Sequence, residues 1–229
     1  MAMADASAKP EALVADRLGV NPGRLHALID GVFAIAITLL VLDLPKPELS
    51  RDLVGDLLRQ WPSYVAYLVS FVTVGILWIE HLGMMSAVVR VNRRFLERTL
   101  LFLLFVSVIP WPTALAARYA DQGSQAAPAA VLYAATMLLM ALSFAGSWRY
   151  LSRHPELVAA PARAAFSAGY RRALLGGLVY LVAIAAVLVS PLVSFAIDAA
   201  VATYFAVSRS DVVSRLIQTS ADQGSGDDD

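Results

Sequence analysis

Residues 25–44 read LHALIDGVFAIAITLLVLDL, and the positions of the charges in this stretch decide the fold class. Twelve uncharged residues follow Asp30 before the next aspartate. Since an α-helix rises about 1.5 Å per residue, these residues cover roughly 18 Å, whereas a bilayer core is about 30 Å thick. A spanning helix must therefore run from about Arg24 to about Leu44, which places Asp30 at membrane depth. A carboxylate there is costly, so it marks a protein interior or a water-filled path.

The composition is that of a helical membrane protein. The 229 residues are 59% hydrophobic and only 16% charged, whereas a soluble domain carries about 25% charge. The net charge is zero and no basic stripe alternates with aromatic residues, which argues against a nucleic-acid partner. The absence of cysteine excludes disulfides, thiolate chemistry and cysteine-based metal sites. No Gly-rich phosphate loop and no convergent Ser, His and Asp are present, so the sequence indicates no enzyme, metal site or cofactor.

Six apolar stretches predict an all-α, polytopic membrane protein with six transmembrane helices. Residues 1–22 are expected to form a cytosolic arm, residues 23–207 the six-span domain, and residues 208–229 a disordered cytosolic tail. The segment 48–60 places its leucines on one face and is expected to lie at the membrane interface. The predicted spans are about 24–44, 62–80, 99–117, 128–148, 173–189 and 192–207.

The basic residues set the orientation of these spans. Fourteen of the 18 Lys and Arg fall in the N-terminal segment up to and including Arg24, in the loops after the second and fourth spans, and in the tail. Because Lys and Arg concentrate on the cytosolic side of a membrane, both termini are predicted to be cytosolic. The first 24 residues lack the apolar core of a cleavable signal peptide, so the opening helix is expected to be an uncleaved anchor.

The opening helix has two different faces. At about 100° per residue, Leu39 and Leu42 fall within about 40° of Ile35, and Thr38 lies about 60° from Ile35. Asp30 lies about 140° from Ile35, on the back of the helix. Several copies of the aliphatic stripe around a symmetry axis would form a pore closed by stacked rings. Ordinary helix packing explains the same stripe, and an intramembrane Asp serves equally as a structural anchor or as part of an ion path.

Residues 24–47 resemble the first helix of the endosomal/lysosomal transmembrane potassium channel family, in its prokaryotic members with one six-span repeat per subunit. That family opens with Arg-x-x-x-Phe-Ser-Asp, followed by a run of the type Gly-Val-Phe-Ala-Ile-Ala-Ile-Thr and an exit ended by proline. Trp78 and His81, at the end of the second span, resemble the family's Trp-x-x-His. The stretch TLLFLLFVSVIPWPT, residues 99–113, is similar to the family's third helix.

The resemblance implies a homotetrameric, potassium-permeable channel in the inner membrane of a prokaryote, with potassium as the permeant ion. It also implies the absence of a backbone-carbonyl filter loop, and no TVGYG-like segment is present in the chain. Ile35 would form the narrowest ring, and Leu39 and Leu42 would form further hydrophobic layers toward the outside. Thr38 would supply a selectivity ring of hydroxyls. The residues that would hold the helix against its neighbours are Arg24, Asp30, Trp78 and His81.

Three positions depart from the pattern of this family. Leu28 and Ile29 stand where the family has Phe and Ser, and Thr99 stands where Asn is usual. These changes remove the side chains that make the hydrogen bonds of the family's Ser and Asn. An alternative function is a proton channel or proton-linked transporter, although no internal repeat relates the first three spans to the last three. That alternative would use Asp30, His81 and Asp198.

Overall fold

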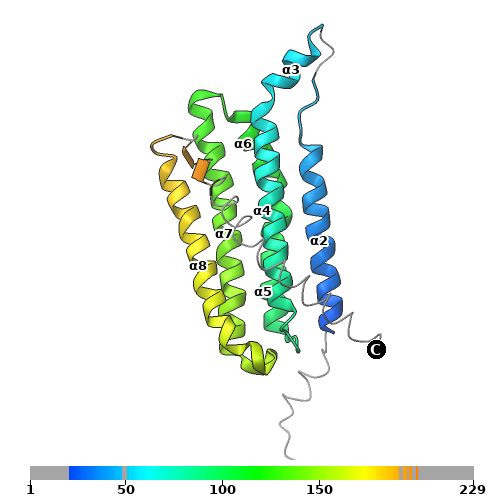
Figure 1. The fold of residues 1–229 in the computed structure, drawn as a ribbon. Helices are drawn as coiled ribbons and strands as arrows, with labels where there is room; N and C mark the ends of the chain where they lie inside the picture. The colour runs from blue at the N-terminus through cyan, green and yellow to red at the C-terminus, as the bar shows by residue number, and fades with distance from the viewer. Residues whose placement is uncertain (1–20, 48–50, 191–192, 195, 198–199, 201–229) are drawn as a thin grey trace, which may run out of the picture.

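The structure, a computed structural model, describes residues 21–47, 51–190, 193, 194, 196, 197 and 200. The predicted sixth span lies mostly outside these residues, and Asp198 is not among them. All the long elements of the described chain are α-helices (Figure 1). The helices are α2 (Pro22–Leu42), α3 (Leu53–Arg59), α4 (Trp61–Met85), α5 (Arg93–Val108), α6 (Pro110–Tyr119), α7 (Ala126–Arg153) and α8 (Arg163–Ala186), with 3₁₀ turns at Gly123–Gln125, Pro155–Leu157 and Ala160–Ala162.

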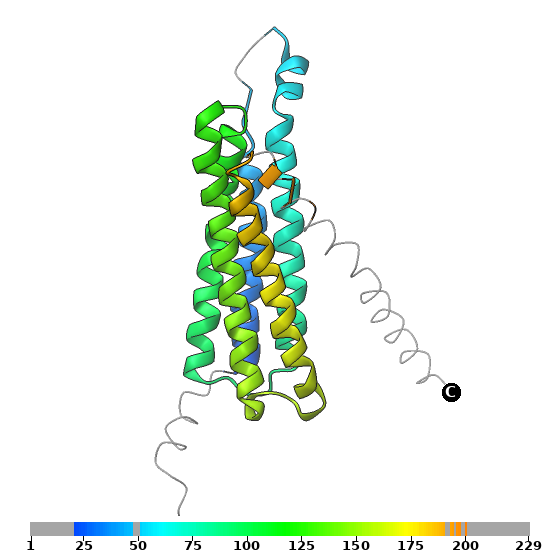
Figure 2. The same cartoon turned by 90° about the vertical axis from the view of Figure 1, so that its left-hand side faces the viewer.

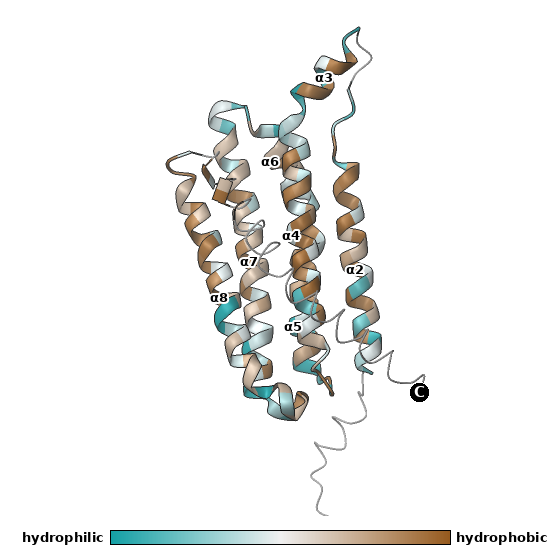
Figure 3. Cartoon of the chain, in the orientation of Figure 1, coloured by the Kyte–Doolittle hydropathy of each residue, from teal (hydrophilic) through white to brown (hydrophobic). Residues whose placement is uncertain are grey.

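The long helices run along one common direction and form an elongated bundle (Figures 1 and 2). α2 lies at one side, where it contacts α4, α5 and α6, whereas α7 contacts α5, α6 and α8. Five helical stretches of the described chain are long and apolar enough to cross a membrane. Hydrophobic residues cover most of the length of these helices (Figure 3). The chain is therefore a polytopic all-α membrane protein, as its sequence predicts.

Side-chain caps and prolines set where these helices begin and end. The side chain of Asn21 accepts a hydrogen bond from the Gly23 N–H at the start of α2. Asn92 does the same for the Phe95 N–H at the start of α5, with an oxygen–nitrogen distance of 2.9 Å. Such caps satisfy N–H groups that have no partner within the first turn. Asn92 caps a polar first turn, so α5 begins at Arg93. The helix therefore starts earlier than the third predicted span, which begins with the apolar stretch at about Thr99.

The third predicted span consists of two helices. α5 ends at Val108 and α6 begins at Pro110, because proline lacks the N–H that continues the helical hydrogen-bond ladder. Near this break, the Ser70 hydroxyl of α4 lies 2.9 Å from the Thr113 hydroxyl of α6 and 3.3 Å from the Tyr133 hydroxyl of α7. Hydroxyl contacts between membrane helices contribute about 0.6–2 kcal/mol each. The break between α5 and α6 therefore lies near polar contacts among α4, α6 and α7.

The loops that follow α4 and α7 are joined at the lower end of the bundle in Figure 1, where α2 begins. Val88 and Val158 form an isolated antiparallel β-bridge between the two loops. The Val89 N–H donates to the Leu157 carbonyl at 2.9 Å. These backbone bonds link the lower end of α4 to the lower end of α7.

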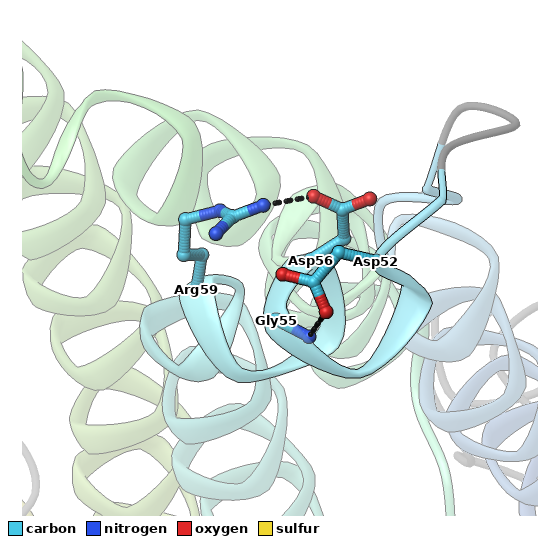
Figure 4. A network of polar contacts seen from close by, with 4 residues as sticks. All are labelled: Asp52, Gly55, Asp56 and Arg59. Atoms are coloured by element: carbon cyan, nitrogen blue, oxygen red, sulfur yellow. Dashed lines mark hydrogen bonds and ion pairs between the residues drawn. The ribbon is translucent and has the colours of Figure 1, made fainter.

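α3 is a short amphipathic helix at the upper end of the bundle. The Asp52 carboxylate accepts a hydrogen bond from the Gly55 N–H at 3.0 Å, and Asp56 forms an ion pair with Arg59 (Figure 4). The polar groups thus gather on one face, as expected of a helix that lies in the membrane interface. The exposed apolar residues of α3 are Leu53, Val54, Leu57 and Leu58.

α7 and α8 are in tight contact at Gly169. A Cβ atom at Gly169 would lie 2.4 Å from ring carbons of Trp148, a distance that real Cβ atoms do not show. A Cβ atom at Gly176, two turns along the same helix, would meet nothing within 4 Å. Only the first of these two glycines is therefore required by the crossing of α7 and α8.

We expect Gly169→Ala to lower the melting temperature of the detergent-solubilised protein, because forcing an extra methyl group into a packed interface costs about 1–3 kcal/mol. Gly176→Ala is the matched control and should leave the melting temperature unchanged or slightly raised, since Ala favours a helix over Gly by about 1 kcal/mol. Equal melting temperatures for the two variants would contradict the close contact with Trp148.

Candidate pore-lining face

α2 is apolar on two faces, but the subunit buries only one of them. The buried residues recur at intervals of three or four, so they form one stripe along the helix. This stripe faces the bundle, since α2 packs on α4, α5 and α6. The buried residues of α2 are Leu25, Ile29, Phe33, Ala36 and Leu40.

The opposite face of α2 is exposed on the single subunit. Ile35 is 60% exposed, Leu39 40% and Leu42 71%. Thr38, on the same face, is also exposed. Each residue that the sequence assigns to the pore therefore lies on the face that its own subunit leaves uncovered. Large apolar side chains gathered on an exposed face mark a contact with lipid or with another protein surface.

The hydroxyl of Thr38 is oriented by its own helix. Its oxygen lies 3.0 Å from the Ala34 carbonyl and 2.9 Å from the Ile35 carbonyl. A hydroxyl has one proton to donate, so these carbonyls take it and the oxygen lone pairs remain as acceptors. An exposed oxygen that acts only as an acceptor is suited to replace a water molecule of a hydrated cation.

Asp30 attaches α2 to α4. The Trp78 indole N–H donates to the Asp30 carboxylate, with a nitrogen–oxygen distance of 2.9 Å. Asp30 itself is exposed on the single subunit. The buried stripe includes Ile29, and the next residue along a helix points about 100° away, at the edge of that stripe. The Asp30 carboxylate is therefore bound by Trp78 of α4 on one side and exposed on the other.

His81 lies in a closed aromatic environment. It is fully buried, and its ring stacks on Phe102 with a centroid distance of 5.2 Å and an interplanar angle of 8°. The rings of Phe33 and Phe144 lie 6.3 Å and 6.1 Å away. Neither ring nitrogen has a hydrogen-bond partner among the described residues. His81 thus brings together side chains from α2, α4, α5 and α7 without a polar bond to any of them.

Two of the three positions that depart from the family pattern, Ile29 and Thr99, agree with this environment. Ile29 is buried and apolar. Thr99 is buried and donates its hydroxyl to the Phe95 carbonyl at 3.0 Å. Neither residue therefore supplies a polar partner to His81.

The structure separates the four predicted motif residues into two groups. Asp30, Trp78 and His81 lie where α2 meets α4. Arg24 is exposed, and its side chain forms no hydrogen bond or ion pair with another described residue. The phenylalanines around His81 are absent from the sequence prediction. They come from three separate helices, so no local spacing in the sequence identifies them. Among the described residues, no group of three His, Asp or Glu is placed to hold a metal ion.

Residues 24–110 match the family described as endosomal/lysosomal potassium channel TMEM175. A potassium channel of Streptomyces collinus is 40% identical over 199 residues, which cover 84% of this chain and 95% of that relative. The chain belongs to the TMEM175 family. Its match to the family includes α2, Trp78 and His81, which are the residues that carry the resemblance in the sequence.

Two further TMEM175 proteins extend the comparison. The crystal structure of a lysosomal potassium-selective channel TMEM175 homolog from Chamaesiphon minutus has a TM-score of 0.74 and 36% identity, covering 82% of this chain and 97% of that chain. The endosomal/lysosomal proton channel TMEM175 of Gallus gallus is 35% identical over 109 residues, which cover 43% of this chain and 22% of that protein. The likeness to the bacterial proteins therefore extends over far more of the chain.

We expect Trp78→Phe to lower the melting temperature, because it removes a hydrogen bond to a charged group worth about 1.5–3 kcal/mol. Trp111→Phe is the control, since Trp111 is 58% exposed on α6 and should tolerate the change. Asp30→Asn retains an oxygen that accepts the indole N–H, so it should cost less than Trp78→Phe. Equal melting temperatures for Trp78→Phe and Trp111→Phe would show that the hydrogen bond between Trp78 and Asp30 does not stabilise the fold.

Proposed function

We propose that this TMEM175-family chain forms a homotetrameric, potassium-permeable cation channel whose pore is lined by α2. The observation that carries the proposal is the division of α2 into a face buried against its own subunit and an exposed face with Ile35, Thr38, Leu39 and Leu42. The potassium-channel names of the bacterial relatives support the choice of permeant ion.

The exposed stripe has the spacing of stacked rings. Residues four positions apart in a helix are separated by about 6 Å along its axis. Four subunits would therefore place a ring of Ile35 about 6 Å from a ring of Leu39, with Leu42 beyond it. Rings of aliphatic side chains repel water from a narrow path, so they act as a gate that opens when the path wets.

Selectivity in this proposal comes from Thr38. No backbone-carbonyl filter sequence is present in the chain, so side chains have to replace part of the hydration shell of the ion. The Thr38 hydroxyl donates its proton to the backbone of its own helix, which leaves its oxygen lone pairs as acceptors. A ring of four such acceptors would favour a weakly hydrated cation over a strongly hydrated one.

The orientation follows from the distribution of basic residues. We infer that the chain lies in the inner membrane of a prokaryote with both termini in the cytosol. The lower end of the bundle is then the cytosolic end. Its exposed arginines are Arg90, Arg93, Arg94, Arg98, Arg149, Arg153, Arg163, Arg171 and Arg172.

A proton channel is the weaker alternative. The relatives named proton channels match only a minority of the chain, and their own sequences are mostly not covered. His81 is enclosed by aromatic rings and Asp30 is hydrogen-bonded to Trp78, which favours structural roles for both. This alternative requires a pH-driven flux that Asp30→Asn abolishes, without any potassium conductance.

We expect Ile35→Ala to increase the potassium conductance of the purified protein in liposomes several-fold, because a smaller side chain widens the ring and weakens the exclusion of water. The matched control is Leu104→Ala, on the exposed face of α5, which should conduct like the wild type. The pore does not pass along this face of α2 if the two variants conduct equally.

Replacing Thr38 tests the source of selectivity. Thr38→Val has nearly the same shape but lacks the oxygen, so the preference for potassium over sodium should fall. Thr38→Ser retains the hydroxyl and should keep most of the preference. Reversal potentials measured in potassium and sodium gradients distinguish these outcomes, and an unchanged ratio in Thr38→Val would exclude the hydroxyl ring.

A further inference from the structure

One face of α7 is exposed along much of the helix, although α7 packs on α5, α6 and α8. The exposed residues recur at intervals of three, seven and four, so they form one stripe. Leucine occupies the upper part of this stripe and arginine the lower part, because α7 ends at the lower end of the bundle (Figure 1). The stripe consists of Leu139, Leu142, Arg149 and Arg153.

α5 carries a matching stripe. Arg94, Arg98 and Leu101 are exposed and lie at intervals of four and three residues, so they also share one face of their helix. α5 begins at the lower end of the bundle, so its arginines again lie below its leucine. Both stripes are therefore charged at the same end and apolar above it.

Arg98 brings the two stripes together. Its guanidinium carbon lies 4.9 Å from the centre of the Tyr150 ring of α7, a cation–π contact that orients the guanidinium without neutralising its charge. One of its terminal nitrogens lies 3.6 Å from the position that a Cβ atom would take at Gly146, one turn earlier in α7. Arg149 lies about 60° around the helix from Gly146, at nearly the same height. The resulting arginine cluster consists of Arg94, Arg98, Arg149 and Arg153.

The arginine cluster forms no ion pair within the described part of the chain. Glu97 of α5 is bound by Arg93 at 2.8 Å, and it points about 100° away from Arg98. Glu156 lies past the end of α7, in the turn Pro155–Leu157. The guanidinium donors of the cluster are therefore available to a ligand.

The arginine cluster coincides with the predicted boundary of the membrane. The third predicted span begins at about residue 99 and the fourth ends at about residue 148. Arg98 and Arg149 directly adjoin these two limits on neighbouring helices. Lipid phosphates lie at this height, whereas the exposed leucines of both stripes face the acyl chains above it.

We propose that the arginine cluster binds a phospholipid with two phosphates joined by glycerol, as in cardiolipin. Guanidinium groups bind phosphate through paired, charge-assisted hydrogen bonds. One phosphate would lie beside the two arginines of α5 and the other beside the two arginines of α7, with the acyl chains along the leucines above. A lipid with one phosphate would engage only one of the two arginine pairs. The site should therefore prefer cardiolipin to phosphatidylglycerol, and it lies on helices other than the pore-lining α2.

Native mass spectrometry of the purified full-length protein, titrated with cardiolipin or phosphatidylglycerol in detergent, measures this preference. Arg98→Gln should weaken cardiolipin binding about tenfold, the factor that corresponds to a lost charged hydrogen bond. It should weaken phosphatidylglycerol binding much less, because a single phosphate can still bind the arginines of α7. Arg171→Gln is the matched control and should change neither. Arg171 is exposed at the same end of the bundle, and it lies about 200° from Gly169, on the face of α8 turned away from α7.

Arg149→Gln tests the second arginine pair without disturbing the fold, since the side chain of Arg149 is exposed and forms no hydrogen bond or ion pair with another described residue. This variant should also weaken cardiolipin binding about tenfold. Equal cardiolipin binding by Arg149→Gln and Arg171→Gln would overturn the proposal, as would equal affinity of the wild type for the two lipids. Displacement of cardiolipin by an equal concentration of inorganic pyrophosphate would assign the arginines to a soluble polyphosphate and also overturn it.

Discussion

The hydrogen bond from Trp78 to Asp30 matters because α2 has apolar side chains on both of its faces. Between membrane helices there is no hydrophobic driving force, since lipid tails are as apolar as leucine. Dispersion contacts alone would therefore distinguish poorly between the two faces of α2 as the one that packs on the subunit. A directional polar contact at the edge of the buried stripe fixes the rotation of α2 about its axis. That rotation determines which four side chains are left facing outward.

The histidine one turn further along α4 contributes in a different way. His81 makes ring contacts with three phenylalanines from three helices and has no polar partner among the described residues. Rings of this size bury a large area and pack in preferred geometries, so such a cluster aligns helices without hydrogen bonds. The contacts of α2 thus combine one polar bond that sets its rotation with an aromatic cluster that sets its distance from its neighbours.

The sequence was sufficient for the fold class and the family, because span length, proline positions and the run from Gly31 to Leu42 are local signals. The exposed stripe of α2 could also be predicted, since helical periodicity alone places Ile35, Leu39 and Leu42 together. The surroundings of Asp30 could not be predicted from the sequence, because the face of a helix that is buried depends on which neighbouring helices cover it. The aromatic cluster, the Ser70–Thr113–Tyr133 contacts and the contact of Arg98 with Tyr150 are formed by residues far apart in the chain, and no periodic pattern indicates them.

The backbone bridge between the loops after α4 and α7 has a mechanical consequence. Val88 and Val158 connect these helices at their lower ends through main-chain hydrogen bonds, which side-chain rearrangement does not break. The lower ends therefore cannot separate without loss of those bonds, whereas side-chain contacts farther up the bundle can slide. The backbone bridge therefore holds α4 and α7 together at this end of the bundle. Trp78 lies in the lower third of α4, so α2 is attached to α4 nearer to the bridged end than to the opposite end.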